Sequence, residues 1–266
     1  MTARIVHALL IAAVSLAGAA GAGAAEWLII CSGQSNMDGR APVADLPAEL
    51  HDGPANVTLY RWGVHDADKP QVRKPLYGPG DKQFGPEAGM IRALAAARPK
   101  DTFIIAKFAV GGTALWQWVP DYAAAGAEYK KPKDPADGHL YVTLKAGLLA
   151  VAKLHPQAMP VAACWLQGES DTGARAKLYL PNLRKLVANL RRDLGAPRLP
   201  FIAAEPADGE PDMYAAYQTL VGEDRATTLI ACRTLAHQDK EHYNAASQLT
   251  IGGRFAEEIV RRLPRK

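Results

Sequence analysis

The segment WLIICSGQSNM, residues 27–37, decides the fold. Its first half, Trp27 to Cys31, is a continuous apolar run, which is typical of a strand that is buried on both faces. Its second half is a glycine-containing turn that places Ser35 just beyond the end of that strand. Five later runs are also predicted to be strands: 57–62, 102–110, 160–166, 200–204 and 227–232.

Helix-like segments fill the gaps between these runs. Their apolar residues recur every three or four positions: Pro86 to Ala97, Leu140 to Leu154, Pro181 to Leu194, and Ser247 to Leu263. Strands that alternate with helices predict an α/β fold, with a mostly parallel sheet covered by helices. The segments 38–56 and 63–85 fit neither pattern, and we predict that they are long loops.

The first 25 of the 266 residues have the pattern of a signal peptide. Arg4 precedes a mostly apolar run from Ile5 to Leu16, and small residues follow at 22–25, where a signal peptidase would cleave. We therefore expect an exported protein, periplasmic or secreted, in which residues 26–266 form one domain.

Composition excludes several classes of protein. No later stretch has the roughly 18 apolar residues of a membrane-spanning helix, so we expect no membrane insertion after removal of the signal peptide. The net charge of +4 comes without a long basic run, so we expect no nucleic-acid partner. Cys31, Cys164 and Cys232 lie in apolar stretches and are expected to be packing residues, although one disulfide among them remains open.

Reactive residues follow the predicted strands, and in parallel sheets the ligand cleft lies beyond those strand ends. Ser35 follows the first strand and needs a base to become a nucleophile. His242 is the best candidate for that base, because Asp239 lies three residues before it and could orient the imidazole. Alternatively, Ser35 caps a helix, and His237 is the reserve candidate for the base.

An acyl-transfer site also needs donors for the oxyanion. Gly111 and Gly112 follow the third predicted strand, and a backbone N–H there can approach a ligand without a Cβ in the way. Gln167 follows the fourth strand and carries an amide donor. An ordinary turn and a structural amide are the alternatives for these residues.

Taken together, the motifs resemble the SGNH hydrolase superfamily, and within it the branch of sialate O-acetylesterase-like domains and family-six carbohydrate esterases. The resemblance depends on five blocks in this order: GQSNM (33–37), FGPE (84–87), GGT (111–113), WLQGESD (165–171) and DKEHYN (239–244). It implies a three-layer α/β/α sandwich with a flavodoxin-like, mostly parallel sheet, no metal or cofactor, and hydrolysis of O-acetyl esters on sugars.

The resemblance also implies roles for single residues. Ser35 would be the nucleophile, His242 the base and then the acid, and Asp239 the orienting carboxylate. The oxyanion hole would comprise the N–H groups of Ser35 and Gly112 and the side chain of Gln167, which stands where the wider superfamily has an asparagine.

Other polar and aromatic residues lie near these motifs in the sequence. Glu169 and Asp171 are alternative partners for His242, although Glu169 is expected to hydrogen-bond the Ser35 loop. Glu87 is expected to be a buried structural acid. Trp116 and Trp118 either form a wall for a sugar ring or pack their loop against the body.

These expectations lead to one functional hypothesis and two alternatives. The hypothesis is a serine esterase that removes O-acetyl groups from carbohydrate, of the acetylxylan or sialate type, through an acetyl-Ser35 intermediate. The same residues could serve a lipid esterase or thioesterase, or the chain could be a non-catalytic carbohydrate-binding protein.

Overall fold

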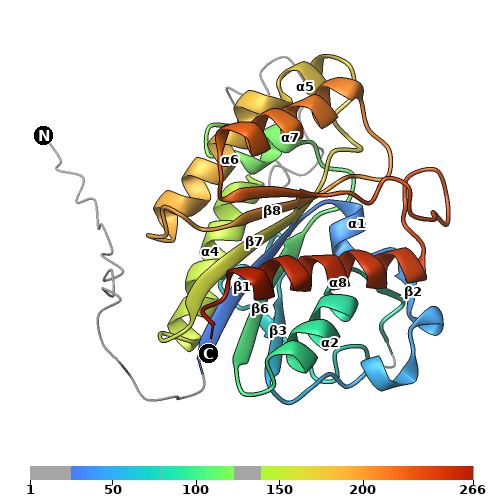
Figure 1. Ribbon diagram of the computed structural model, residues 1–266, viewed down its shortest axis with the longest axis vertical. Helices are drawn as coiled ribbons and strands as arrows, with labels where there is room; N and C mark the ends of the chain where they lie inside the picture. Colours follow the sequence, from blue (N-terminus) through green and yellow to red (C-terminus); the bar gives the residue numbers. More distant parts are fainter. Residues whose placement is uncertain (1–24, 79, 123–138, 266) are drawn as a thin grey trace, which may run out of the picture.

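The computed structural model describes residues 25–78, 80–122 and 139–265. Its main feature is a seven-stranded sheet in the order β4-β3-β6-β1-β7-β8-β9, in which β1 (Glu26–Gly33) is central (Figure 1). All neighbouring strands are parallel except β3 and β4. The other strands of this sheet are β3 (Val57–Arg61), β4 (Gln71–Val72), β6 (Thr102–Ala109), β7 (Met159–Leu166), β8 (Phe201–Ala204) and β9 (Thr227–Ile230).

The six strands predicted from the sequence are therefore confirmed. β4 was not predicted, because its two residues are both exposed and give no apolar pattern. A second, two-stranded sheet joins β2 (Ala41–Pro42) to β5 (Gln83–Phe84). Among the described residues of the two long predicted loops, the remaining elements are the short 3-10 turns η1 (Val43–Asp45) and η2 (Ala48–Leu50).

The four predicted helices are also confirmed, each within two residues at either end. The helices are α1 (Ser35–Asp38), α2 (Glu87–Ala97), α4 (Leu140–Leu154), α5 (Ala174–Lys177), α6 (Tyr179–Asp193), α7 (Pro211–Glu223) and α8 (Ala245–Arg262), with a 3-10 turn η3 (Leu115–Trp118). α7 was missed, although its buried residues Met213, Ala216, Tyr217 and Leu220 are spaced three and four apart.

Helices cover both faces of the sheet, which gives the three-layer α/β/α sandwich that was expected. α2 and α8 lie side by side on one face, and α4, α6 and α7 cover the other (Figure 1). The strand β1 serves both cores, because Ile29 and Cys31 point toward α2 and α8 while Leu28 and Ile30 point to the opposite side. This double burial explains why β1 is apolar from Trp27 to Cys31.

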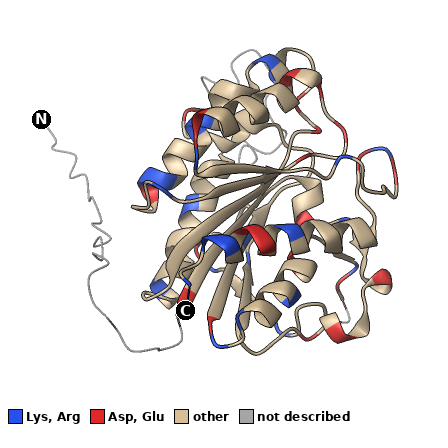
Figure 2. Cartoon of the chain, viewed as in Figure 1, with Lys and Arg blue, Asp and Glu red and all other residues tan. Residues whose placement is uncertain are grey.

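Two further sequence expectations concern the cysteines and the N-terminus. Cys31, Cys164 and Cys232 are buried free thiols, as expected for packing residues. The predicted signal peptide falls on residues 1–25, which lie outside the described residues except for Ala25. In the described part of the chain, no helix is long and apolar enough to span a membrane. Positively and negatively charged residues are interspersed along the helices and loops (Figure 2).

Candidate active site

The turn after β1 presents Ser35. Gly33 ends the strand with φ +149°, and a Cβ there would lie 2.0 Å from the carbonyl oxygen of Leu166, so only glycine fits. α1 begins at Ser35 without a side-chain cap, so the capping role weighed for this serine is not observed. The Ser35 side chain instead turns to His242, with 3.1 Å between Ser35 Oγ and His242 Nε2.

His242 lies on the loop between β9 and α8 and is oriented by Asp239. Its Nδ1 lies 2.9 Å from Asp239 Oδ2, and Asp239 Oδ1 also accepts the backbone N–H groups of Glu241 and His242, both at 2.8 Å. A carboxylate beside Nδ1 holds the proton on that nitrogen and leaves Nε2 free to accept the serine proton. Burial acts to raise the pKa of Asp239, but the hydrogen bonds from His242 and from these N–H groups lower it overall.

Asn36 joins the serine turn to the histidine loop. It is fully buried, and its Nδ2 donates to Glu169 Oε1 at 2.5 Å and to the carbonyl of Glu241 at 2.8 Å. Its Oδ1 accepts the backbone N–H of Tyr243 at 3.0 Å. This residue received no role from the sequence, although it stands inside the GQSNM block, directly after Ser35.

Two backbone N–H groups on the turns after β1 and β6 are unpaired, and these turns approach each other at Gly111, where a Cβ would lie 3.6 Å from Ser35 Cβ. Across the described ranges 25–78, 80–122 and 139–265, the N–H groups of Ser35 and Gly112 donate to no acceptor. Gly112 has φ +71°, and the space where its Cβ would lie is empty. Free backbone donors on these two turns are the kind of group that an oxyanion hole requires.

The structure places Gln167 differently from the prediction. This side chain is fully buried, and its Nε2 donates to Asp171 Oδ2 at 2.5 Å and to the carbonyl of Thr113 at 2.9 Å. An amide nitrogen carries two protons, and both are used by these acceptors. Gln167 therefore has no proton left for an oxyanion, and it joins the ends of two strands instead.

The two carboxylates that were alternatives to Asp239 do not contact His242. Glu169 accepts the expected hydrogen bond from Asn36, and Asp171 accepts the N–H of Leu115 at 3.0 Å. Burial raises the pKa of Glu169 to about 7, and burial raises the pKa of Asp171 to about 6, although hydrogen bonds oppose both shifts.

A buried ion pair contacts the last residue of α1. Lys107, in the middle of β6, pairs with Glu87 and donates to the carbonyl of Asp38 at 3.0 Å. Tyr77 donates to the other oxygen of Glu87 at 2.7 Å. Glu87 is thus a buried structural acid, as expected, whereas Lys107 was missed, although one charge within an apolar strand is a visible signal.

The two tryptophans and His237 make packing contacts with other aromatic and polar side chains. Trp118 is fully buried, and its indole N–H donates to Thr113 Oγ1 at 3.1 Å, so it packs the core and cannot face a sugar. Trp116 is 5 % exposed and stacks on Tyr122. The ring of His237 packs edge-on against Tyr243, with 5.0 Å between the centroids.

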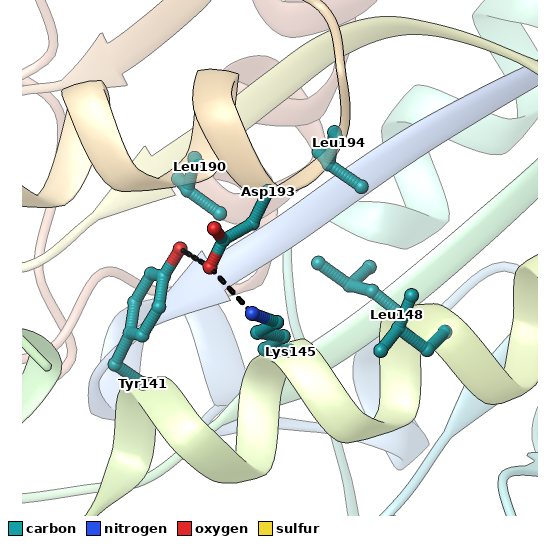
Figure 3. Close-up of a pocket in the computed structure, with 7 residues that line it drawn as sticks. Tyr141, Lys145, Leu148, Leu190, Asp193 and Leu194 are labelled. Carbon is teal, nitrogen blue, oxygen red and sulfur yellow. Dashed lines mark hydrogen bonds and ion pairs between the residues drawn. The ribbon is translucent and has the colours of Figure 1, made fainter. Parts of the chain in front are cut away.

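A hollow between α4 and α6 is lined by Tyr141, Lys145, Leu148 and Asp193 (Figure 3). Its volume of about 10 Å³ holds at most one water molecule. Tyr141 and Lys145 both bind Asp193 there, at 2.9 and 3.1 Å. These contacts tie two helices together, and the hollow is too small for a substrate.

Comparison with known proteins agrees with this geometry. Residues 25–261 match the family model described as carbohydrate esterase, sialic acid-specific acetylesterase. No curated protein matches the sequence.

Solved structures share the fold. A protein from Arabidopsis thaliana is 20 % identical, with a TM-score of 0.68 over 90 % of this chain and 100 % of its own. NanS is 16 % identical, with a TM-score of 0.64 over 90 % of this chain and 98 % of its own. A carbohydrate acetylesterase from Xanthomonas citri is 18 % identical, with a TM-score of 0.62 over 86 % of this chain and 55 % of its own.

Proposed function

Since the chain belongs to the family of carbohydrate esterases described as sialic acid-specific acetylesterases, we propose that it hydrolyses O-acetyl groups on sugars through an acetyl-Ser35 intermediate. Membership of this family makes it a carbohydrate O-acetylesterase. The observation that supports the serine mechanism is the chain of contacts from Ser35 Oγ to His242 Nε2, 3.1 Å, and from His242 Nδ1 to Asp239, 2.9 Å.

In the first half of the reaction, Ser35 Oγ attacks the acetyl carbonyl carbon while His242 Nε2 takes the hydroxyl proton. The negative charge that develops on the carbonyl oxygen is stabilised by the N–H groups of Ser35 and Gly112, which have no other acceptor among the described residues. Asp239 stabilises the imidazolium. His242 then gives its proton to the sugar oxygen, the ester bond breaks, and the acetyl group remains on Ser35.

In the second half, a water molecule attacks the acetyl carbon as His242 Nε2 takes one of its protons. The tetrahedral intermediate collapses, Ser35 Oγ recovers the proton, and acetate leaves. This sequence needs no contribution from Gln167. We propose that Gln167 instead stabilises the loops after β6 and β7 through its hydrogen bonds to Thr113 and Asp171.

The substrate is proposed to be an acetylated carbohydrate of the acetylxylan or sialate type, and the protein is proposed to act after export. A lipid esterase or thioesterase would use the same three residues. Rates on acetyl and octanoyl nitrophenyl esters separate the two, since an acetylesterase is expected to prefer the acetyl ester strongly.

Covalent labelling tests the mechanism directly. An organophosphonate is expected to add to Ser35, as identified by mass spectrometry of the digested protein, and to abolish acetate release from acetylated sugars. Ser35→Ala is expected to take up no label and to retain its circular dichroism spectrum. Labelling of a different residue, with activity lost in parallel, would refute the assignment of Ser35.

A further inference from the structure

Lys107 is a buried cation in the middle of the sheet. Its side chain is 1 % exposed, and its neighbours across the sheet are Cys31 of β1 and Arg61 of β3. Its ammonium pairs with Glu87, whose side chain is fully buried. Replacing a buried ion pair by apolar residues of similar volume is often neutral or stabilising. Stability alone is therefore a weak reason for a charge at this position.

The ammonium also contacts the helix that begins at Ser35. Lys107 Nζ donates to the carbonyl of Asp38 at 3.0 Å. Asp38 is the last residue of α1, and the final carbonyl groups of a helix have no partner within the helix. A hydrogen bond from the N–H of Gly39 to the carbonyl of Ser35, at 2.8 Å, closes this single turn. Because α1 is only one turn long, a donor that fixes its last carbonyl also limits the movement of Ser35.

The strand that carries Lys107 also contacts the start of the serine turn. Val110 directly follows β6, and its N–H donates to the carbonyl of Gly33 at 3.1 Å. Gly33 ends β1, two residues before Ser35. β6 and the residue after it therefore hold the serine turn at both ends, through Val110 before Ser35 and through Lys107 after it.

The turn after β6 contains the second proposed oxyanion donor. Gly111 and Gly112 directly follow Val110, and a Cβ on Gly111 would lie 3.6 Å from Ser35 Cβ. Donors of an oxyanion hole act only within about 3 Å of the developing charge. A small shift of the serine turn against the glycine turn would therefore weaken the stabilisation of the oxyanion.

The carboxylate that binds Lys107 is itself fixed. Tyr77 donates to Glu87 Oε1 at 2.7 Å, and the N–H of Gly85 donates to the same oxygen at 3.3 Å. Burial acts to raise the pKa of Glu87, but the charge of Lys107 lowers it overall, so the carboxyl group stays ionised. The ammonium is thus held by an anchored carboxylate, and it can hold the carbonyl of Asp38 in turn.

We infer that Lys107 is a positioning residue for the oxyanion hole, because it holds the Ser35 turn against the turn of Gly111 and Gly112. This inference rests on the proposed function. Lys107 acts through the backbone of Asp38 and not through the substrate. Removing it should therefore slow the chemical step and leave substrate binding nearly unchanged.

The test is the double variant Lys107→Met with Glu87→Gln, which removes both charges together and leaves no buried charge alone. With an acetyl ester, kcat is expected to fall by about 10²-fold, because the donors are displaced, and KM should stay nearly the same. An organophosphonate should label Ser35 more slowly in proportion, but completely. The pH at which kcat is half-maximal should stay that of the wild type, because His242 and Asp239 keep their contacts.

Two variants are matched controls. Tyr77→Phe removes a hydrogen bond from the same carboxylate but leaves the contact between Lys107 and Asp38. Arg98→Met with Asp101→Asn removes an ion pair of 2.8 Å before the opposite end of β6. Both controls are expected to lower the free energy of unfolding and to keep the kcat of the wild type. A wild-type kcat per labelled serine in the Lys107 double variant would show a role in stability alone and overturns the inference.

A second variant covers the case in which the double variant does not fold. Lys107→Met, Glu87→Leu and Tyr77→Phe together replace the ion pair and its hydroxyl by apolar side chains, a change that buried ion pairs often tolerate. The same loss of kcat at constant KM is expected, and a wild-type kcat in this triple variant overturns the inference. Failure of the wild type to release acetate or to take up the label would instead refute the proposed function.

Discussion

The turn that carries Ser35 and the loop that carries His242 are built in opposite ways. Ser35 and Asn36 are 6 % and 0 % exposed and follow the central strand directly. By contrast, the side chains of Asp239 and His242 are 50 % and 22 % exposed. The nucleophile is thus fixed by the core, whereas the base depends on a few hydrogen bonds at the surface.

The comparison identifies where the two halves are joined. Asn36 reaches from the buried turn to Glu241 and Tyr243 on the loop. Gln238 reaches back from the loop to the carbonyl of Arg40. Substitutions in the turn, in the loop and at the junction should therefore differ in what they do to turnover and to stability.

The largest decrease in kcat is expected for substitutions of Ser35 and His242, which must act together. Ser35→Ala and His242→Ala should each lower kcat on an acetyl ester by about 10⁴-fold or more, and the double variant should be no slower than either single one. Proton transfer requires both side chains, so removing the second adds no further loss. Effects that multiply in the double variant would show that Ser35 and His242 act independently.

Asp239→Asn tests the exposed half alone. The variant keeps a similar shape but loses the charge that stabilises the imidazolium, and kcat should fall by about 10³-fold, with KM nearly unchanged. The free energy of unfolding should change by less than about 0.5 kcal/mol, because the site is half exposed. A decrease in kcat of less than threefold would argue that another acid orients His242.

Asn36→Ala tests the junction. It leaves the N–H of Tyr243 and the carboxyl group of Glu169 without this partner, so we expect about 2 kcal/mol of lost stability. Displacement of the histidine loop should also lower kcat by about 10²-fold. Urea unfolding and acetate release measure the two effects separately.

Asn56→Ala provides the control for a partly buried, hydrogen-bonded amide far from the site. Asn56 Nδ2 donates to the carbonyl of Asp101 at 2.9 Å, before the start of β6. This variant is expected to lose stability without loss of kcat. Equal losses of kcat in the two asparagine variants would contradict the junction role of Asn36.

The sequence predicts the fold of this protein well, because buried strands and helices each have a local pattern of apolar residues. The strand β1 and its parallel neighbours are mostly apolar on both faces, and α4 runs over the predicted residues, Leu140–Leu154. The same reasoning selects Ser35, Asp239 and His242, because parallel strands bring their carboxyl ends to one edge of the sheet.

The directions of side chains are less predictable, because they depend on neighbours from other strands. Gln167 follows a strand as an oxyanion donor would, yet Asp171 and the carbonyl of Thr113 take its protons. Trp118 could have faced a ligand, but Phe108 and Trp165 enclose it. Only three-dimensional contacts decide these cases.

Substitution of Glu169, which binds Asn36 in the buried Ser35 turn, is expected to change turnover least and to change the pH dependence of stability most clearly. Burial raises its pKa to about 7 from an ordinary 4.5, and its Oε2 has no hydrogen-bond partner within the part of the chain that the structure describes. Between these pH values the folded protein holds a proton that the unfolded chain has released. This contribution to stability is therefore complete below pH 4.5 and is lost as the pH rises to 7, by roughly 3 kcal/mol.

Glu169→Gln should remove that part of the pH dependence, as measured by urea unfolding between pH 5 and pH 8. Asp171, with its pKa raised to about 6, contributes with the same sign, so some pH dependence of stability should remain in the variant.

Asp239→Asn is the corresponding substitution in the exposed loop. Its pKa is lowered in the folded protein, so its small contribution is present above its unfolded pKa and is lost only in acid. The opposite result would be a loss of the pH dependence of the free energy of unfolding between pH 5 and pH 8 in Asp239→Asn but not in Glu169→Gln. It would contradict the claim that the buried Glu169, and not the exposed Asp239, causes this dependence.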